Sequence, residues 1–198
     1  MRVLVACEYS GKVRDAFTKL GWEAWSCDLL ASETEGNHYQ GNVMEILQYG
    51  WDLMIGHPPC TYLTNSGVRW LYNDDKTKNE ERWKLMEEGA AFFRELLNAP
   101  IERILLENPI PHRYATELIG HKYDQKIQPW MFGHGETKAT CFWLKNLPKL
   151  ISTNLVKGRD QRIHKLGPSE DRWKLRSETY QGIADAIAEQ YHKYFLLK

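Results

Sequence analysis

The sequence predicts an α/β fold in which helices cover both faces of a mostly parallel sheet. Two observations support this prediction. Short apolar runs alternate with amphipathic stretches along the chain, and no internal repeat or low-complexity linker interrupts them. A chain of 198 residues is long enough to bury one full core and too short for two, so we expect a single domain over 1–198.

The first half of the sequence predicts three strands and one helix. Residues 2–7 form a short β-branched run, and residues 22–30 predict a second strand that ends near Asp28. Residues 51–59 predict a buried strand that two prolines terminate. Between the first two strands, apolar side chains in residues 11–21 recur at helical spacing and a glycine closes the stretch, which favours a helix.

A long amphipathic helix opens the second half. Residues 79–98 place apolar side chains on one stripe opposite charged ones, and Asn79 can cap this helix. Residues 101–109 and 137–148 predict two further strands, and residues 177–197 predict a closing helix. Because strands and helices alternate, we expect the strands to be mostly parallel.

The overall composition excludes several classes of protein. The 26 lysines and arginines balance 26 acidic residues, so any nucleic acid must bind to a local basic patch. The four cysteines lie far apart without a CxxC pair, and the histidines show no ligand spacing beside them, so we expect no metal. The sequence has neither a signal peptide nor an apolar run of membrane-spanning length, which predicts a cytoplasmic protein.

The strongest functional signal lies at the ends of the predicted strands. Carboxyl ends of parallel strands share one edge of the sheet, where such folds bind ligands. There Pro58 and Pro59 restrain Cys60, as a nucleophilic thiol requires. Glu107 and Asn108 can present an acceptor and a donor to a heterocycle that carries an amino group beside a ring nitrogen. The alternatives are a half-buried structural cysteine and an ordinary strand-end turn.

Six segments occur in a fixed order over nearly the whole chain: VACEYSG, CD, GHPPC, LLENP, TKATCFWL and TYQGIADAIA. This series resembles the DNA cytosine-5 methyltransferase family, particularly its short phage-type members. The resemblance implies the Rossmann-like fold of S-adenosylmethionine-dependent methyltransferases and methylation of cytosine carbon 5 in the DNA of a bacterial or phage-infected cell. Cys60 would add to carbon 6, and Glu107, followed by Asn108, would bind ring nitrogen 3 and the amino group. Lys138 would contact the cytosine carbonyl oxygen.

The resemblance also implies a binding site for S-adenosylmethionine. Its residues would be Glu8, Ser10, Gly11, Asp28, Asn42, Pro58, Thr179 and Gly182. Asp28 would bind the ribose hydroxyls, and the amide oxygen of Asn42 would accept the adenine amino group where the family has an aspartate. Turn or capping roles are the alternative for these residues.

The chain departs from the family pattern in its first loop, in Thr61 after the cysteine, and in its late strand, which lacks the family's two arginines. Only residues 149–176 replace the usual large target-recognition region. This basic insertion holds eight lysines or arginines against three acids, a net charge of +5. We expect it to bind DNA phosphates through Lys157, Arg159, Arg162 and Lys165, whereas a merely solvated loop is the alternative.

Three other functions stay open. GHPPC is similar to the Asp/Asn-Pro-Pro-aromatic motif of amino-group methyltransferases, with His57 and Cys60 at the polar and aromatic positions. The substrate can instead be RNA or a free pyrimidine nucleotide, or the chain can be a catalytically silent member of the fold that binds DNA or a protein. A chain with so short an insertion would favour single-stranded DNA or recruit a second copy or partner subunit.

Overall fold

A seven-stranded sheet forms the centre of the computed structural model, which describes residues 1–170 and 172–197. The strands are β1 (Arg2–Ala6), β2 (Glu23–Asp28), β3 (His38–Gln40), β4 (Leu53–Gly56), β5 (Ile104–Pro109), β6 (Gln125–Ile127) and β7 (Thr140–Lys145). Their order in the sheet is β3-β2-β1-β4-β5-β7-β6. The first five in this order are parallel, and β7 runs antiparallel to both of its neighbours. This topology is that of a Rossmann-like methyltransferase fold.

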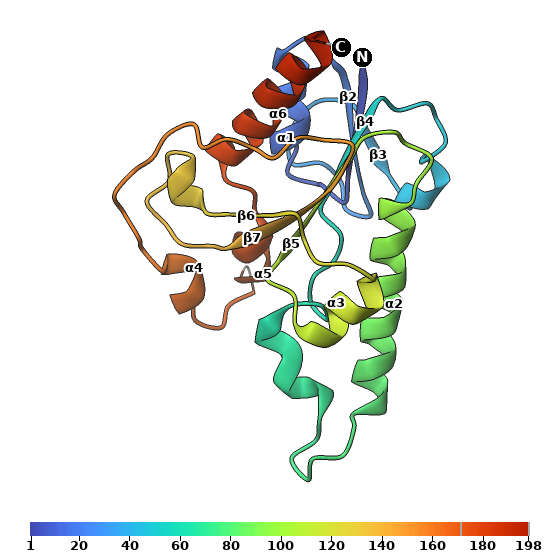
Figure 1. Cartoon of the computed structure of the whole chain (residues 1–198), viewed down its shortest axis with the longest axis vertical. Coiled ribbons are helices and arrows are strands. Elements are labelled where there is room, and N and C mark those ends of the chain that lie inside the picture. Colours follow the sequence, from blue (N-terminus) through green and yellow to red (C-terminus); the bar gives the residue numbers. More distant parts are fainter. Residues whose placement is uncertain (171, 198) are drawn as a thin grey trace.

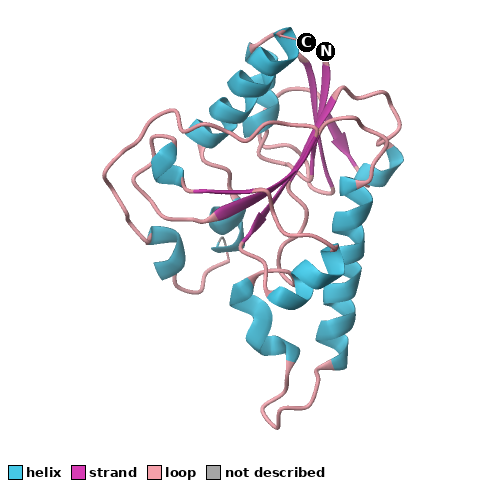
Figure 2. Cartoon of the chain, in the orientation of Figure 1, coloured by secondary structure: helices cyan, strands magenta, loops and turns pink. Residues whose placement is uncertain are grey.

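Helices cover both faces of the sheet, as the sequence predicted (Figure 1). The α-helices are α1 (Lys12–Lys19), α2 (Glu80–Leu97), α3 (Arg113–Ile119), α4 (Arg162–Lys165), α5 (Arg172–Ser177) and α6 (Gln181–Leu196). Three 3-10 helices, η1 (Val43–Glu45), η2 (Asn65–Leu71) and η3 (Pro129–Met131), lie in the connections. Figure 2 shows α1 and α6 packed together on one side of the strands and α2 with α3 on the other. Within the described ranges, no helix combines the length and the apolar character needed to cross a membrane.

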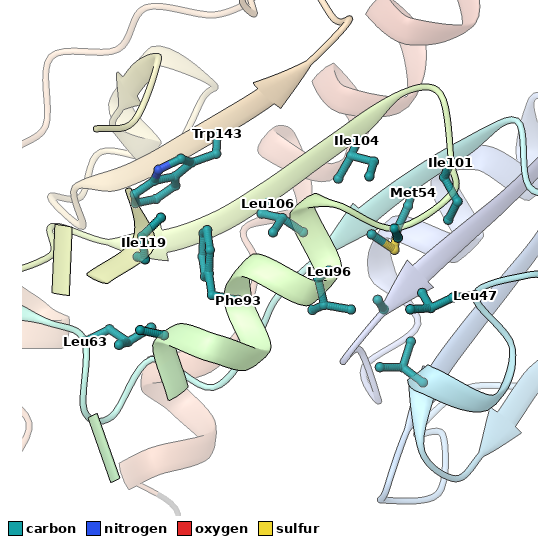
Figure 3. Close-up of a cluster of buried hydrophobic side chains, with 14 of the residues drawn as sticks. Leu47, Met54, Leu63, Phe93, Leu96, Ile101, Ile104, Leu106, Ile119 and Trp143 are labelled. Atoms are coloured by element: carbon teal, nitrogen blue, oxygen red, sulfur yellow. The ribbon is translucent and has the colours of Figure 1, made fainter. Parts of the chain in front are cut away.

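The face under α2 holds the larger part of the core. Phe93 of α2 packs against Trp143 of β7, with ring centroids 4.9 Å apart, and Leu96 and Leu106 lie beside them (Figure 3). The predicted cap of this helix is confirmed, because the Asn79 side chain accepts the backbone N–H of Arg82 at 3.1 Å. An Asn cap of this kind stabilises a helix by about 1 kcal/mol.

The observed elements differ from the prediction mainly where they are short. β3 and β6 have three residues each, too few for an alternating pattern to appear in the sequence. β7 is shorter than the predicted strand over 137–148. Cys7 lies just after β1 in a left-handed conformation, with φ 58°, and not inside a strand as its apolar neighbours had suggested. The basic insertion also contains two helices, α4 and α5.

Candidate active site

The parallel strands bring the predicted reactive residues to one edge of the sheet. In the pairing of β4 with β5, Gly56 lies opposite Leu106. His57 follows Gly56 and Glu107 follows Leu106, so these two side chains come into contact. His57 is also tied to β1, because its N–H donates to the Ala6 carbonyl at 2.9 Å.

His57 and Glu107 form a mostly buried ion pair. The Nδ1 atom of His57 lies 3.2 Å from Oε2 of Glu107, and the two side chains are 13% and 18% exposed. Burial favours a neutral histidine, but the hydrogen bond and charge of Glu107, assisted by Glu8, raise the pKa of His57. Burial alone would raise the pKa of Glu107. The hydrogen bond and charge of His57 and the charge of Lys138 have a larger effect, so that pKa is lowered. Both shifts favour the charged pair over the neutral pair.

Cys60 lies half-buried in the tight turn that follows β4. Its carbonyl accepts the N–H groups of Leu63 and Thr64 at 3.0 and 3.2 Å, which fixes the turn. Burial, and then the charge of Glu107, raises the pKa of the Cys60 thiol to about 11, although Lys138 and Arg176 act in the opposite direction. The thiol is therefore protonated in the resting protein.

Lys138, just before β7, supplies a positive charge to the same place. Its Nζ donates to the carbonyl of Glu178 at 2.9 Å. Burial lowers the pKa of Lys138, whereas the charges of Glu107 and Cys60 raise it. The structure thus brings a thiol, a carboxylate and an ammonium group close enough for each to influence the others.

Two buried polar atoms at this edge have no hydrogen-bond partner among residues 1–170 and 172–197. They are Nε2 of His57 and Oδ1 of Asn108. The amide nitrogen of Asn108 donates to the carbonyl of Pro109, so only the amide oxygen is unengaged. Buried polar atoms without partners are rare, and they commonly mark functional positions.

The first loop after β1 is built around the start of α1. The two carboxylate oxygens of Glu8 accept the N–H groups of Val13 at 2.8 Å and Arg14 at 3.2 Å. Ser10 contacts the same carboxylate at 3.4 Å. Gly11 has φ 73°, and a Cβ there would lie 2.2 Å from Oγ1 of Thr34, so the turn requires glycine. These contacts give Glu8 a capping role.

The next two predicted cofactor residues differ in how much of the side chain is engaged. Oδ1 of Asp28, at the end of β2, accepts the N–H of Leu30 at 2.9 Å. Its Oδ2 makes no hydrogen bond within the described part of the chain. Asn42 is exposed, and its amide oxygen accepts the N–H of Met44 at 3.1 Å and caps η1. Pro58 is buried in the turn between β4 and Cys60.

A cavity of about 330 Å³ lies beside the first loop, a volume in the range of small-molecule sites. Its lining is formed by Tyr9, Ser10, Glu33, Lys174, Leu175 and Glu178. Lys174 and Leu175 of α5 form part of its wall, and two ion pairs, Lys12 with Glu178 and Lys174 with Glu33, hold this segment in place. A second cavity of about 480 Å³ is lined by residues that include Arg103 and Asn146, at the opposite end of β5 and β7, and is therefore remote from Cys60.

The last predicted cofactor residues lie between the cavity and α6. Thr179 is half-buried directly after Glu178, which lines the cavity. The N–H of Gly182 donates to Nε2 of His134 at 3.0 Å. A Cβ at Gly182 would lie 2.0 Å from the carbonyl oxygen of Phe132, so the close approach of α6 requires glycine. The glycine turn at Gly11 and the unengaged oxygen of Asp28 follow β1 and β2, at the edge where a nucleoside-type cofactor would bind in this fold.

The predicted phosphate-binding residues are exposed but differ in their contacts. Arg162 pairs with Glu136 through two hydrogen bonds of 3.1 and 3.2 Å. The guanidinium of Arg159 lies 3.9 Å from the centroid of the Trp130 ring. Lys157 and Lys165 make no ion pair in the described ranges, so their charges are accessible to a partner.

Sequence reasoning missed two charged groups at this edge. The sequence gives His57 a role only in the amino-group motif. Its contact with Glu107 follows from the strand register, which the sequence does not reveal. Arg176 belongs to the basic insertion, yet its charge acts on both Cys60 and Lys138. The described residues contain no cluster of three or more His, Cys, Asp or Glu side chains that could hold a metal ion.

Comparisons with known proteins give distant structural similarity. No family model and no curated protein matches the chain. One similar solved structure is a protein assigned as a DNA modification methyltransferase encoded within a prophage of E. coli. It has 17% identity and a TM-score of 0.44, and the match covers 73% of this chain and 46% of that one. Another is the methyltransferase EhMeth of Entamoeba histolytica, with 13% identity, a TM-score of 0.47, and coverage of 79% and 57%. The chain spans about half the length of these proteins, and its fold assignment rests on its own sheet topology.

Proposed function

We propose that this protein methylates cytosine at carbon 5, in DNA, through a covalent bond between Cys60 and the base. The observation that carries the proposal is that the Glu107 carboxylate and the Lys138 ammonium lie near enough to the Cys60 thiol, at the carboxyl edge of the sheet, for their charges to act on it. A thiol held by a rigid turn suits a nucleophile, and the two charged groups suit a base that accumulates charge as it reacts.

Each of the three residues has a defined task in this proposal. The thiol of Cys60 gives its proton to water, and the resulting thiolate forms a bond to carbon 6 of cytosine, which makes carbon 5 nucleophilic. Glu107 binds ring nitrogen 3 and the amino group, so it holds the ring and stabilises the charge that appears on it. Lys138 contacts the carbonyl oxygen of the ring. After methyl transfer, carbon 5 loses its proton to water and the thiolate of Cys60 leaves carbon 6, which restores the aromatic ring.

The donor would be S-adenosylmethionine, bound beside the first loop. When bound, it supplies an electrophilic methyl group. The glycine turn at Gly11 would approach its methionine end, the unengaged oxygen of Asp28 would accept a ribose hydroxyl, and the α5 segment would exclude water from the cavity.

DNA as the substrate is supported by the charge of the basic insertion, +5 over 149–176. Its accessible lysines, Lys157 and Lys165, suit phosphate contacts that carry no sequence information. The target base must leave its stack to reach Cys60, because the thiol lies half-buried in its turn.

The experiment that tests the proposal uses DNA that contains 5-fluorocytosine. Fluorine cannot leave carbon 5 as a proton does, so with S-adenosylmethionine the wild-type protein should form an adduct that survives denaturing electrophoresis. Cys60→Ser should form none, while Cys27→Ser should retain the adduct, because Cys27 is buried in β2. Methyl transfer by Cys60→Ser at the wild-type rate would refute the covalent mechanism.

A further inference from the structure

His57 is the buried titratable group at the active-site edge to which the proposed chemistry gives no task. It lies one residue beyond β4, and its Nδ1 contacts Oε2 of Glu107 at 3.2 Å. Its other ring nitrogen, Nε2, is buried without a partner among the described residues. A proton on this ring can therefore pass to another protein group only through Nδ1, toward Glu107.

The charges around His57 favour its protonated form. Glu107 approaches from β5 and Glu8 from the loop after β1, whereas Lys138, before β7, opposes them. The imidazole of His57 thus has two carboxylates and one ammonium group around it. The effect of these groups exceeds that of burial, so the pKa of His57 is raised while that of Glu107 is lowered. In the resting protein the proton of the pair belongs to the imidazole.

This arrangement raises a chemical problem for the proposed reaction. When a thiolate adds to carbon 6, an electron pair moves through the ring to nitrogen 3, which then needs a proton. An ionised carboxylate is an acceptor only and cannot donate a hydrogen bond or a proton. Glu107 therefore needs a neighbour that supplies the proton at that moment.

We propose that His57 is a positioning residue that stores the proton which Glu107 delivers to ring nitrogen 3 of cytosine. The inference rests on the proposed function. The S–H bond of Cys60 first breaks and its proton passes to water. As the resulting thiolate forms its bond to carbon 6, the double bond moves from carbons 5 and 6 to carbons 4 and 5. A bond between nitrogen 3 and hydrogen forms, and the Nδ1–H bond of His57 breaks.

The proton completes a closed cycle. Glu107 accepts one proton from His57 while it gives one to the ring, so the carboxylate ends each step as it began. When carbon 5 has gained the methyl group, the double bond between nitrogen 3 and carbon 4 re-forms, and the proton returns to His57 by the same route. The pair thus supplies and recovers the proton of nitrogen 3, whereas the proton of the Cys60 thiol is exchanged with water.

The first test measures the proton on His57 in the free protein. NMR titration of the imidazole in the wild-type protein should give a pKa above the ordinary value of about 6.5. The same titration in Glu107→Gln should give a lower pKa, because the carboxylate charge is gone. A wild-type His57 that is neutral throughout the range from about pH 6 to 8 would overturn the inference, whatever the substrate is.

The second test measures the rate of adduct formation on 5-fluorocytosine DNA as a function of pH. The wild-type rate should rise with pH as the Cys60 thiol ionises and level off at the pKa that NMR assigns to His57, because the protonated imidazole is lost above it. His57→Gln keeps an N–H donor for Glu107 but cannot release a proton, so it should be roughly 100-fold slower and continue to rise without this levelling. His192→Gln is the matched control. His192 lies on α6, outside the site, where it accepts the indole N–H of Trp22.

The outcomes separate the inference from the function on which it rests. If His57→Gln is slower by one factor at every pH and its rate levels off at the same pH as the wild-type rate, His57 only packs against Glu107 and the inference is wrong. If the wild-type protein forms no adduct although the pKa of His57 is raised, the proposed function is wrong. The transfer of the proton to cytosine is then wrong as well. A rate that no longer levels off in His57→Gln but still does so in His192→Gln supports the inference.

Discussion

Cys60 should react with iodoacetamide far more slowly in the folded protein than in the unfolded chain. Burial, followed by the charge of Glu107, raises the pKa of this thiol to about 11. At about pH 8, roughly one Cys60 in a thousand then carries the thiolate, whereas about a quarter of ordinary cysteines with a pKa of about 8.5 do so. Since only the thiolate is alkylated, we expect the folded protein to react roughly 200-fold more slowly than the protein in urea.

The pH dependence and two variants sharpen this prediction. Between about pH 7 and 10 the rate should rise about tenfold per pH unit, because each unit below the pKa changes the thiolate fraction tenfold. The charge of Lys138 lowers the pKa of Cys60, so Lys138→Met should slow alkylation further. Lys84→Met is the matched control, because Lys84 lies on the exposed side of α2, next to Glu88.

The assay follows the peptide that contains Cys60 by mass spectrometry after quenched alkylation. This readout keeps the other three cysteines, Cys7, Cys27 and Cys141, out of the measurement. Folded protein that reacts within a few-fold of the urea sample at about pH 8 would show that burial does not protect the thiol. Equal rates for Lys138→Met and Lys84→Met would show that Lys138 is too distant to act on it.

Three further predictions concern the cofactor site, the fold and DNA. Glu107→Gln should slow methyl transfer strongly and leave S-adenosylmethionine affinity nearly unchanged by calorimetry, whereas Asp28→Ala should weaken that affinity; the reverse pattern would mean that the two sites are exchanged. Gly182→Ala should cost about 1–3 kcal/mol and lower the melting temperature by roughly 2–10 °C, since its Cβ would lie 2.0 Å from the Phe132 carbonyl oxygen. An unchanged melting temperature would contradict this. Replacing Lys157 and Lys165 with serine should reduce the salt dependence of DNA binding by about two counterions, and an unaltered slope would exclude these residues as phosphate contacts.

The strands and helices that the sequence predicted well are those with a long or strongly patterned apolar face. α2 is an example, with Met86, Ala90 and Phe93 buried on one stripe and Asn79 as its cap. The convergence of strand ends at one edge also followed from the sequence, since it needs only the knowledge that the strands are parallel. β3 was missed because three residues give no period.

The contact between His57 and Glu107 needed information that no local pattern contains. The two residues are separated by 50 positions, and they meet only because Gly56 and Leu106 share a register position. A shift of one residue in that pairing would turn the two side chains to opposite faces. Glu8 and Asn42 illustrate a different limit, because an oxygen that can cap a helix can also bind a ligand. Their observed hydrogen bonds are those of caps.

The place of α5 in the cavity wall bears on the order of events in the proposed reaction. Lys174 of α5, paired with Glu33, belongs to the same insertion as the exposed lysines. Exposed ion pairs of this kind contribute at most about 1 kcal/mol each, so α5 can move at little cost in free energy. A polyanion that draws the insertion toward itself would pull on the same stretch of chain, and salt would weaken both sets of contacts together. Under the proposed function, the arrival of DNA and the exchange of the cofactor would be mechanically linked through this segment.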